Sequence, residues 1–371
     1  MKICMLADAP CVHTRRLASS VAARGHYVRV VSYKPAEIPG VCVEPYRVPR
    51  FGLRYPARWD RRRTMHLRRL MREHDVVHVQ FLQDFGLSPE IAAAGRLLVT
   101  PLGSDVVKPP EIKVWAEPVA RYRRELIRMG HTVCVWSHAF TADVAAFADI
   151  PREGIEVVPM GVDLDQFQPR PREKDRPLTV GFFKGFKPVY GPTVLARAIP
   201  KVLWRMPSAR FELVGGGPQR DECRAIIEAA GAGDAVTWID PVPHESLPEH
   251  IARWDVCAIP SICESFCVAA LEAAAMEVPI VASRVCGLVE TVRDGQTGLL
   301  VPSNDVDALT GAIVRLLNDA GLRRTMGRAG RRMVAEEYEW NGCVQRWESL
   351  YARMAGTPRG ASRLCGAGAP A

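Results

Sequence analysis

The feature that most constrains the fold is an alternation of short apolar runs with helical patterns along most of the chain. In the first third, a helical pattern that ends at Gly25 separates the runs KICMLA and YVRVVS, and DVVHVQFL and RLLVTPLGSD follow. Later, LTVGFF, RFELVG, AVTWI, DVCAIPS and PIVAS form a second series, with helical patterns between most of them. Strands that alternate with helices build parallel sheets flanked by helices. The sequence therefore predicts an α/β protein with two such sheets.

A polar stretch at residues 163–177, DLDQFQPRPREKDRP, interrupts the alternation and carries three prolines, which indicates a linker. A length of 371 residues also favours two domains over one. We expect Rossmann-like, doubly wound domains at 1–165 and 170–337, with ligand loops at the carboxyl ends of their strands and a cleft between them. A helix at about 338–356 is expected to pack back on the first domain. The Gly/Ala/Pro-rich tail 357–371 is expected to be disordered.

The composition is globular, with 48% hydrophobic and 24% charged residues and no apolar run near the roughly 18 residues that a membrane helix needs. The N-terminal stretch MKICMLADAP enters a strand-like run directly and lacks the features of a signal peptide, so we expect a cytoplasmic location. Eleven cysteines are scattered without a CxxC pair, which favours buried thiols over disulfides or zinc ligands.

The formal net charge of +8 is concentrated in one segment. Nine arginines and one acidic residue, Asp60, lie between Arg50 and Arg72, and the rest of the chain is nearly neutral. Leu67, Leu70 and Met71 would share one face of a helix in this segment. Such a helix either lies on an anionic membrane surface or is a solvated helix with an apolar inner face. The patch comes without a known nucleic-acid-binding motif, so we expect no nucleic-acid partner.

The stretch CESFCVAALE, at residues 263–272, places two glutamates eight positions apart around small and apolar residues. A helix that begins near Ser265 would direct its free N–H groups and the positive end of its dipole toward a ligand, an arrangement that binds phosphate. Eight helical positions span about 12 Å, close to the distance from a sugar across a diphosphate to a ribose. Glu264 could then meet the sugar and Glu272 the ribose. Alternatively, each buried carboxylate ends in an ordinary salt bridge.

This stretch resembles the glutamate, seven residues, glutamate signature of the family 4 retaining glycosyltransferases, which have the two-domain GT-B fold. Further segments resemble the same family, namely VVPMGVDLDQFQP, VGGGP, PHESLPEHIARWDVCAIPS and GLVETVRDGQTGLLVPSNDVDAL. Near the N-terminus, HTRRLASSVAARGHYVRVVS and LGSDV resemble the first βαβ unit and an acceptor-side loop of a subgroup. The resemblance covers most of residues 1–355 and is most specific over 209–309.

The resemblance implies a role for individual residues. Glu264 would contact the transferred sugar, Glu272 would bind the ribose hydroxyls, and Lys184 and Lys187 would stabilise the leaving diphosphate. The residues implied for donor binding through the backbone are Ser265, Phe266, Cys267 and Val268, together with Gly216 in the glycine turn. The residues implied on the acceptor side are His13, Thr14 and, as a catalytic carboxylate, Asp105.

Several positions depart from the family pattern. His13 and Thr14 stand in place of the usual glycine pair of the N-terminal loop, and Asp105 stands where many relatives have a histidine. Cys267 stands where glycine is usual, Val189 where a lysine is frequent, and Met160 where asparagine is common. Cys267 and Val189 support an alternative, a catalytically silent relative that binds a nucleotide or a membrane as a partner subunit. The DLD at 163–165 mimics a metal-binding motif of another glycosyltransferase fold, and we interpret it as a coincidence in the linker. Because basic side chains supply the phosphate charge, we expect no metal and no other cofactor.

The resemblance thus implies a retaining glycosyltransferase that moves a sugar from a nucleotide diphosphate sugar to an acceptor held by the N-terminal domain. The expected partners are the nucleotide-sugar donor, a glycan or lipid-linked acceptor of the cell envelope, and an anionic membrane that the Arg50–Arg72 segment contacts. Front-face transfer and domain closure about the linker are implied as well. The sequence leaves the sugar, the base and the acceptor open.

Overall fold

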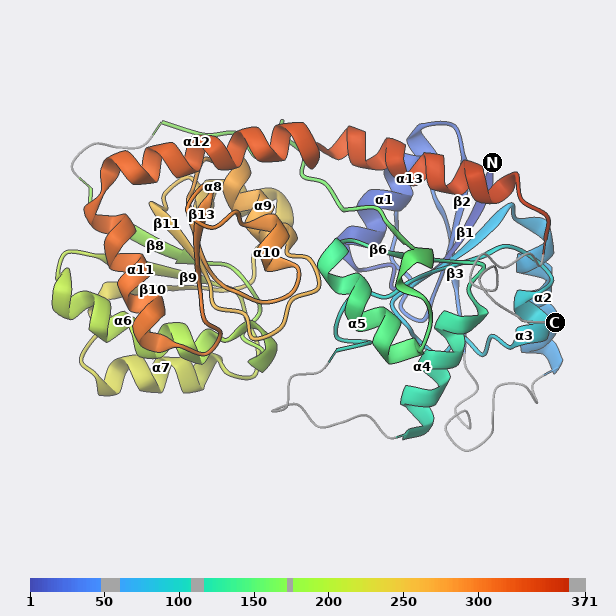
Figure 1. Cartoon of the computed structure of the whole chain (residues 1–371), viewed down its shortest axis with the longest axis horizontal. Coiled ribbons are helices and arrows are strands. Elements are labelled where there is room, and N and C mark those ends of the chain that lie inside the picture. The colour runs from blue at the N-terminus through green and yellow to red at the C-terminus, as the bar shows by residue number, and fades with distance from the viewer. Residues whose placement is uncertain (48–60, 108–116, 172–175, 360–371) are drawn as a thin grey trace. The chain divides into compact units, whose positions relative to one another are not determined.

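The computed structural model describes residues 1–47, 61–107, 117–171 and 176–359. These residues form two compact units (Figure 1). The first unit contains the described residues up to Pro159 and those from Cys343 onward. The second unit contains Met160–Gly342.

The described part of the first unit is built on a parallel sheet of seven strands in the order β3-β2-β1-β4-β5-β6-β7. The strands are β1 (Lys2–Leu6), β2 (Tyr27–Ser32), β3 (Cys42–Pro45), β4 (Val76–Gln80), β5 (Leu97–Thr100), β6 (Thr132–Val135) and β7 (Ile155–Val157). The helices are α1 (Val12–Ala23), α2 (Arg61–Glu73), α3 (Pro89–Ala92), α4 (Glu117–Met129), α5 (His138–Ala148), the 3-10 turn η2 (Arg152–Gly154) and, from Cys343 onward, α13 (Trp340–Ala355).

The described part of the second unit has a parallel sheet of six strands in the order β10-β9-β8-β11-β12-β13. The strands are β8 (Thr179–Phe182), β9 (Arg210–Val214), β10 (Val236–Ile239), β11 (Val256–Ile259), β12 (Ile280–Ser283) and β13 (Gly298–Val301). The helices are α6 (Pro192–Arg205), α7 (Arg220–Ala229), α8 (Leu247–Ile251), α9 (Val268–Ala275), α10 (Leu288–Thr291), α11 (Val306–Asn318) and α12 (Ala320–Glu337), with 3-10 turns η3 (Pro188–Tyr190), η4 (Gly233–Ala235) and η5 (His244–Ser246).

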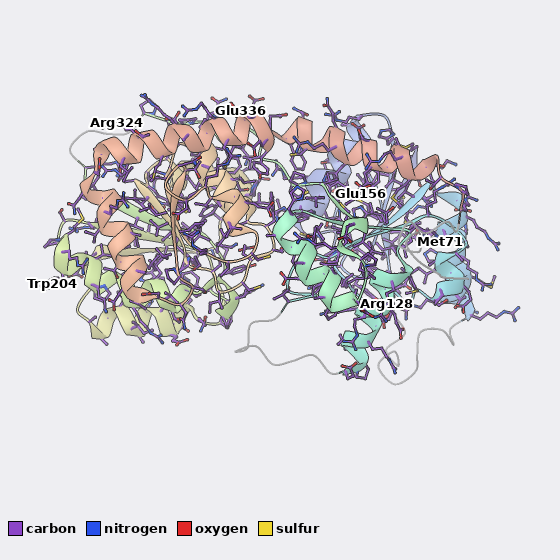
Figure 2. The ribbon with its side chains drawn as sticks, viewed as in Figure 1. Met71, Arg128, Glu156, Trp204, Arg324 and Glu336 are labelled. Atoms are coloured by element: carbon purple, nitrogen blue, oxygen red, sulfur yellow. The ribbon has the colours of Figure 1, made fainter. Side chains whose placement is uncertain are left out.

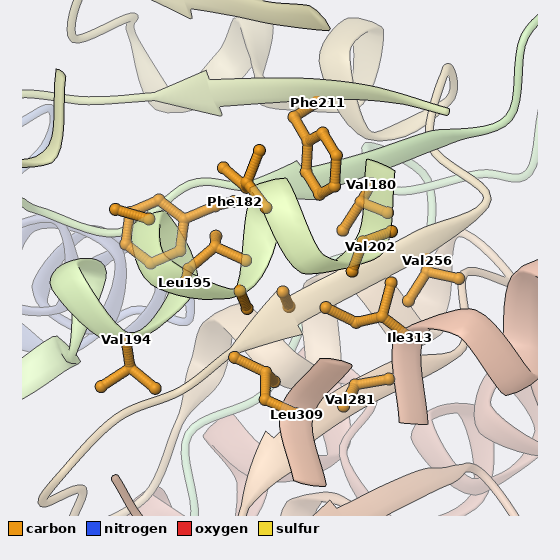
Figure 3. Close-up of a cluster of buried hydrophobic side chains, with 14 of the residues drawn as sticks. Val180, Phe182, Val194, Leu195, Val202, Phe211, Val256, Val281, Leu309 and Ile313 are labelled. Carbon is orange, nitrogen blue, oxygen red and sulfur yellow. The ribbon is translucent and has the colours of Figure 1, made fainter. Parts of the chain in front are cut away.

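Alternate side chains of the second sheet form one continuous core with the helices α6, α7 and α11 (Figure 3). Val180 and Phe182 of β8 point into it, as do Phe211 and Leu213 of β9. This spacing of two follows from the pleat of a strand, which directs successive side chains to opposite faces. The helices use the spacing of three and four instead, as in the buried Leu309 and Ile313 of α11. Each unit is therefore doubly wound, as the sequence predicts.

Two predicted elements have different bounds in the structure. The helix predicted from about Ser265 begins at Val268, because Cys267 has extended rather than helical backbone angles. The helix predicted at about 338–356 is α13, which begins after a break at Tyr338 and Glu339. Of the predicted tail, only residues 357–359 lie within the described part of the chain.

The basic helix α2 buries its apolar face inside the first unit. Leu67, Leu70 and Met71 are each 1% exposed, and Figure 2 labels Met71 on this helix. The idea that these three side chains could enter a membrane is therefore wrong, because they already pack in the protein core. The part of the arginine-rich segment before Arg61 lies outside the described residues. Within the described residues, each helix is too short or too polar to cross a bilayer.

Candidate functional site

The site lies where four neighbouring strands of the second sheet end. The loops 183–187, 215–217, 240–246 and 260–267 follow β8, β9, β10 and β11 respectively. All the strands are parallel, so their carboxyl ends share one edge of the sheet. The chain leaves β8 toward β9 on one side, while β11 lies on the other side of β8. Such a switch point between adjacent strands is where open α/β sheets bind ligands.

Lys184 and Glu264 face each other across this switch point. The Nζ of Lys184 donates a hydrogen bond to Oε2 of Glu264 and forms a salt bridge with it. The same ammonium lies 4.3 Å from the centre of the Tyr190 ring, a distance typical of cation–π contacts. The side chains of Lys184 and Glu264 are only 11% and 14% exposed, so the two form a largely desolvated ion pair.

Cys267 completes the surroundings of the Lys184 ammonium. Its Sγ lies 3.5 Å from Nζ, and the residue is 2% exposed. Burial raises the pKa of the Cys267 thiol to about 12, so the thiol is neutral at pH 7. Burial by itself would lower the pKa of Lys184, but the neighbouring Cys267 and Glu264 raise it above its ordinary value. With a neutral thiol, Glu264 is the anion that keeps this lysine charged.

The glycine turn supports the loop that carries Lys184. Gly217 has φ +150°, and a Cβ there would lie 2.7 Å from the carbonyl oxygen of Phe186. The backbone N–H of Phe186 donates to the carbonyl of Gly216 at 2.9 Å. Glycine is required because the two backbones approach too closely for a side chain. Gly216, which the sequence assigns to donor binding, therefore also fixes the lysine loop.

Glu272 lies on α9 and is 5% exposed. Its Oε1 is 2.6 Å from Nε2 of His244, which begins the 3-10 turn after β10. His244 is not among the site residues predicted from the sequence. It lies 28 positions before Glu272, and the two meet at the edge of the sheet where all the strands have their carboxyl ends. Both glutamates of the CESFCVAALE stretch thus have a basic partner in the structure.

The remaining residues predicted for the donor side have different surroundings. Phe266 is 2% exposed, and its ring lies 5.9 Å from that of Tyr338. Val268 is the first residue of α9, and the carbonyl of Ser265 lies close to Gly287. Lys187 is exposed on the loop after Lys184. That Ser265, Phe266 and Val268 offer their backbone to a ligand stays a prediction, and the exposed Lys187 has its ammonium available.

The residues predicted for the acceptor side lie at the corresponding edge of the first sheet. Thr14 is 2% exposed, and its Oγ1 donates to Oε1 of Gln80, at the end of β4, at 3.1 Å. The His13 ring lies edge-on to Trp136, with ring centres 5.2 Å apart. These two pairs join α1 to the ends of β4 and β6. This edge includes the switch point of the first sheet, between β1 and β4.

Asp105 is completely buried, and its carboxylate accepts hydrogen bonds from backbone N–H groups. It accepts hydrogen bonds from the N–H groups of Leu82, Leu102 and Gly103 at 2.8–3.2 Å. Burial raises the pKa of Asp105, and these N–H donors oppose that shift by favouring the ionised form. The contacts show a carboxylate that ties the loops after β4 and β5 together, so a catalytic role would require it to leave them.

Metal ligands are not clustered in the described part of the chain. Within the described residues, the structure contains no group of three or more His, Cys, Asp or Glu side chains placed to hold a metal ion. In the DLD sequence, Oδ1 of Asp163 accepts the backbone N–H groups of Asp165 and Gln166, at 2.9 and 3.2 Å. This carboxylate therefore closes a turn in the connecting segment.

Comparison with known families matches nearly the whole chain. Residues 164–333 match the family described as glycosyl transferases group 1, and residues 12–166 match glycosyltransferase family 4. A GDP-mannose-dependent alpha-(1-6)-phosphatidylinositol monomannoside mannosyltransferase from Mycolicibacterium smegmatis is 33% identical over 297 residues, which cover 74% of this chain and 76% of that protein.

Two further proteins are similar to the chain. A D-inositol 3-phosphate glycosyltransferase from Kribbella flavida is 35% identical over 192 residues, which cover 47% of this chain and 45% of that protein. Among solved structures, Anabaena HepE in complex with UDP and glucose has a TM-score of 0.77 at 18% identity, covering 95% of this chain and 99% of that one. At this identity the structural likeness shows the fold alone.

Proposed function

Because this chain belongs to the group 1 glycosyltransferases of family 4 and has the GT-B fold, we propose that it transfers mannose from GDP-mannose to a lipid-linked acceptor, with retention of configuration. The observation that carries the proposal is the pair of glutamates at the carboxyl edge of the second sheet, Glu272 buried and Glu264 only 14% exposed, each beside a basic side chain. The donor and the acceptor class are those named for the Mycolicibacterium smegmatis relative. Anabaena HepE, a protein of the same fold, is crystallised with UDP and glucose.

In the proposed complex, Glu272 accepts hydrogen bonds from the ribose hydroxyls. The backbone N–H groups at the start of α9 face the diphosphate, which the positive end of the helix dipole favours. Glu264 meets the mannose near the reacting carbon. Lys184, already held at this point by Glu264, turns its ammonium toward the diphosphate, and Lys187 adds a second positive charge.

We propose front-face transfer for the chemical step. The bond from the anomeric carbon to the diphosphate breaks, and the acceptor oxygen bonds to that carbon on the same face. An oxygen of the departing diphosphate takes the proton of the acceptor hydroxyl. Lys184 and Lys187 stabilise the negative charge that develops on the diphosphate, which is where preorganised charge contributes most to the rate.

A second candidate function follows from Cys267. Its sulfur lies 3.5 Å from the Lys184 ammonium, at a position where the family pattern has glycine, and it could obstruct the approach of the diphosphate. The protein would then be a catalytically silent subunit that binds a nucleotide or a membrane. The change Cys267→Gly separates the two functions. If the unchanged protein is catalytically silent, Cys267→Gly should give it donor turnover. If it is an active enzyme, it already shows turnover with Cys267 in place.

The proposal is tested with purified full-length protein, GDP-mannose and a phosphatidylinositol mannoside acceptor. We expect transfer, an α-linked product by NMR, and weaker activity with uridine diphosphate sugars. If the protein neither hydrolyses nor transfers the sugar of any donor, the proposal is contradicted.

Transfer is also expected to need no divalent metal, because two lysines and the helix N–H groups supply the positive charge at the diphosphate. Excess EDTA should leave the rate unchanged. A loss of activity that only Mn²⁺ or Mg²⁺ restores would show that this part of the proposal is wrong.

A further inference from the structure

His244 links the buried carboxylate of Glu272 to the segment that carries Gln166, near the start of the second unit. On one side, its Nε2 lies 2.6 Å from Oε1 of Glu272. On the other side, its Nδ1 lies 3.5 Å from the amide nitrogen of Gln166, which also donates to the carbonyl of His244 at 3.2 Å. The ring of Phe167 packs at 5.4 Å between centres. The imidazole is therefore held from three directions.

The amide of Gln166 determines which nitrogen of His244 carries the proton. An amide NH₂ group can only donate, so the Nδ1 that faces it must accept. In the neutral ring the proton then lies on Nε2, and Nε2 donates to Glu272. This is the arrangement in which a neutral imidazole makes a charge-assisted hydrogen bond to a carboxylate.

The segment that carries Gln166 is itself fixed to α9. The guanidinium of Arg331, on α12, donates to the carbonyl of Ala275 at 2.7 Å and also to the carbonyl of Phe167. Ala275 is the last residue of α9, so a cation stands at the negative end of the helix that carries Glu272. Arg331 thus connects the segment to α9, and His244 makes a second connection through its contacts with Gln166 and Glu272.

The hydrogen bond from His244 leaves half of the carboxylate available. It engages Oε1, and within the described residues Oε2 of Glu272 accepts no hydrogen bond. A carboxylate that can rotate loses part of its binding energy to the entropy of ordering. One oxygen fixed by His244 sets the plane of the carboxylate and presents the other oxygen to a ligand with two adjacent hydroxyl groups.

We propose that His244 is a positioning residue for nucleotide recognition, which orients Glu272 toward the ribose hydroxyls and is itself oriented by Gln166. The proposal rests on the proposed function, in which Glu272 binds the ribose. It predicts that the loss of His244 weakens only the recognition of the hydroxyls. The base and the diphosphate should be bound as before.

The experiment compares GDP with 2′,3′-dideoxy-GDP by calorimetry on the full chain. His244→Ala should weaken GDP about five- to tenfold, the typical effect of one hydrogen bond to a charged group, and leave the dideoxy nucleotide unchanged. His244→Gln, which places an amide donor near the position of Nε2, should recover most of the loss. Gln166→Ala should reproduce a smaller part of it, about two- to threefold.

The chain provides a matched control in a second histidine–glutamate pair. His250 lies 2.8 Å from Glu212 in the same unit, so His250→Ala removes a contact of the same kind that has no role in the proposed complex and should leave both affinities unchanged. An equal loss for both nucleotides in His244→Ala, or no loss for either, would overturn the inference. Glu272→Ala separates this from the proposed function. If Glu272→Ala does not discriminate between the nucleotides, the ribose assignment itself fails. If Glu272→Ala discriminates and His244→Ala does not, only the inference fails.

Discussion

At the residue scale, the two glutamates of the CESFCVAALE stretch have different partners. Replacing each of them should therefore have a different effect on nucleotide binding and on turnover. In the proposed complex Glu272 presents its second oxygen to the ribose, so Glu272→Ala should weaken GDP binding by about 1.5–3 kcal/mol, roughly ten- to a hundredfold. Glu264 holds the Lys184 ammonium, and its removal leaves that cation available to the diphosphate. Glu264→Ala should therefore keep GDP affinity within about threefold of the parent and lower kcat. Calorimetry with GDP and donor turnover measure the two effects, and an abolished GDP affinity in Glu264→Ala would contradict them.

The partners of these residues show what a single sequence can predict at this scale. The motif places Glu264 and Glu272 on one loop and helix, because both lie within ten consecutive residues. It cannot place His244, since that residue follows β10, which β9 and β8 separate from β11 in the sheet, and only the folded loops bring the two side chains together. The roles assigned to Glu264 and Glu272 stay predictions. For Asp105 the sequence shows an acidic residue in a loop, and only the structure shows that backbone N–H groups already occupy it.

At the element scale, strand β8 depends on a residue with no side chain. A Cβ at Gly181 would lie 1.8 Å from the ring of Trp254, which is fully buried. Gly181→Ala should therefore lower the stability of the second unit by about 3 kcal/mol or more, because the ring cannot move aside in a packed core. Gly311, on α11, is the matched control, since a Cβ there meets nothing within 4 Å. Gly311→Ala should be neutral or stabilise by about 0.5–1 kcal/mol. Thermal unfolding distinguishes them, and similar midpoints would contradict this account.

Helix α13 is joined to the first sheet by a buried histidine whose charge state predicts a pH dependence. His78 lies 2.8 Å from both the Tyr351 hydroxyl and the Thr100 hydroxyl, and burial lowers its pKa from 6.5 to about 3. The unfolded chain takes up a proton below pH 6.5 and the folded chain does not, so stability is complete above pH 6.5 and falls as the pH drops toward 3. The loss is about 1.4 kcal/mol per pH unit for this group.

Unfolding midpoints measured between pH 7 and pH 5 test this expectation. His74 and His131, whose pKa values burial also lowers, contribute in the same direction. His78→Gln, which cannot take up a proton in this range, should therefore reduce the slope without removing it. If the unfolding midpoint of His78→Gln falls with pH as steeply as that of the parent protein, His78 is not the source of the pH dependence.

At the scale of the whole molecule, the division into two sheets could be predicted from the sequence, because alternating strands and helices have few ways to pack. The strands that the patterns missed are β3, β6, β7 and β13. β3 (CVEP) lies at an edge of its sheet and is exposed or half-buried throughout, so it has no apolar run to recognise. The sequence could not show what the apolar side chains of the Arg50–Arg72 segment contact. A helix face that packs into the protein core and one that lies on a membrane have the same periodicity of apolar residues.

The outer face of α2 still leads to a prediction about the whole protein. Arg61, Arg68 and Arg72 are exposed on it, together with Met65, which is 62% exposed. Arg63 does not belong to this face, because its Nε donates to the Tyr46 hydroxyl and to the carbonyl of Phe85. We expect the full chain to bind vesicles with anionic lipid, and added salt to weaken the binding because the attraction is electrostatic.

The triple change of Arg61, Arg68 and Arg72 to Gln should reduce sedimentation with these vesicles severalfold, since each arginine near such a surface contributes to the attraction. The same triple change at Arg324, Arg328 and Arg332 is the control. These three side chains are exposed on α12, where Figure 2 labels Arg324, and their replacement removes the same charge from the second unit. If the α2 face makes the contact, only the first triple releases the protein. If both triples weaken binding equally, the attraction follows net charge alone, and equal binding to neutral vesicles would exclude an electrostatic contact.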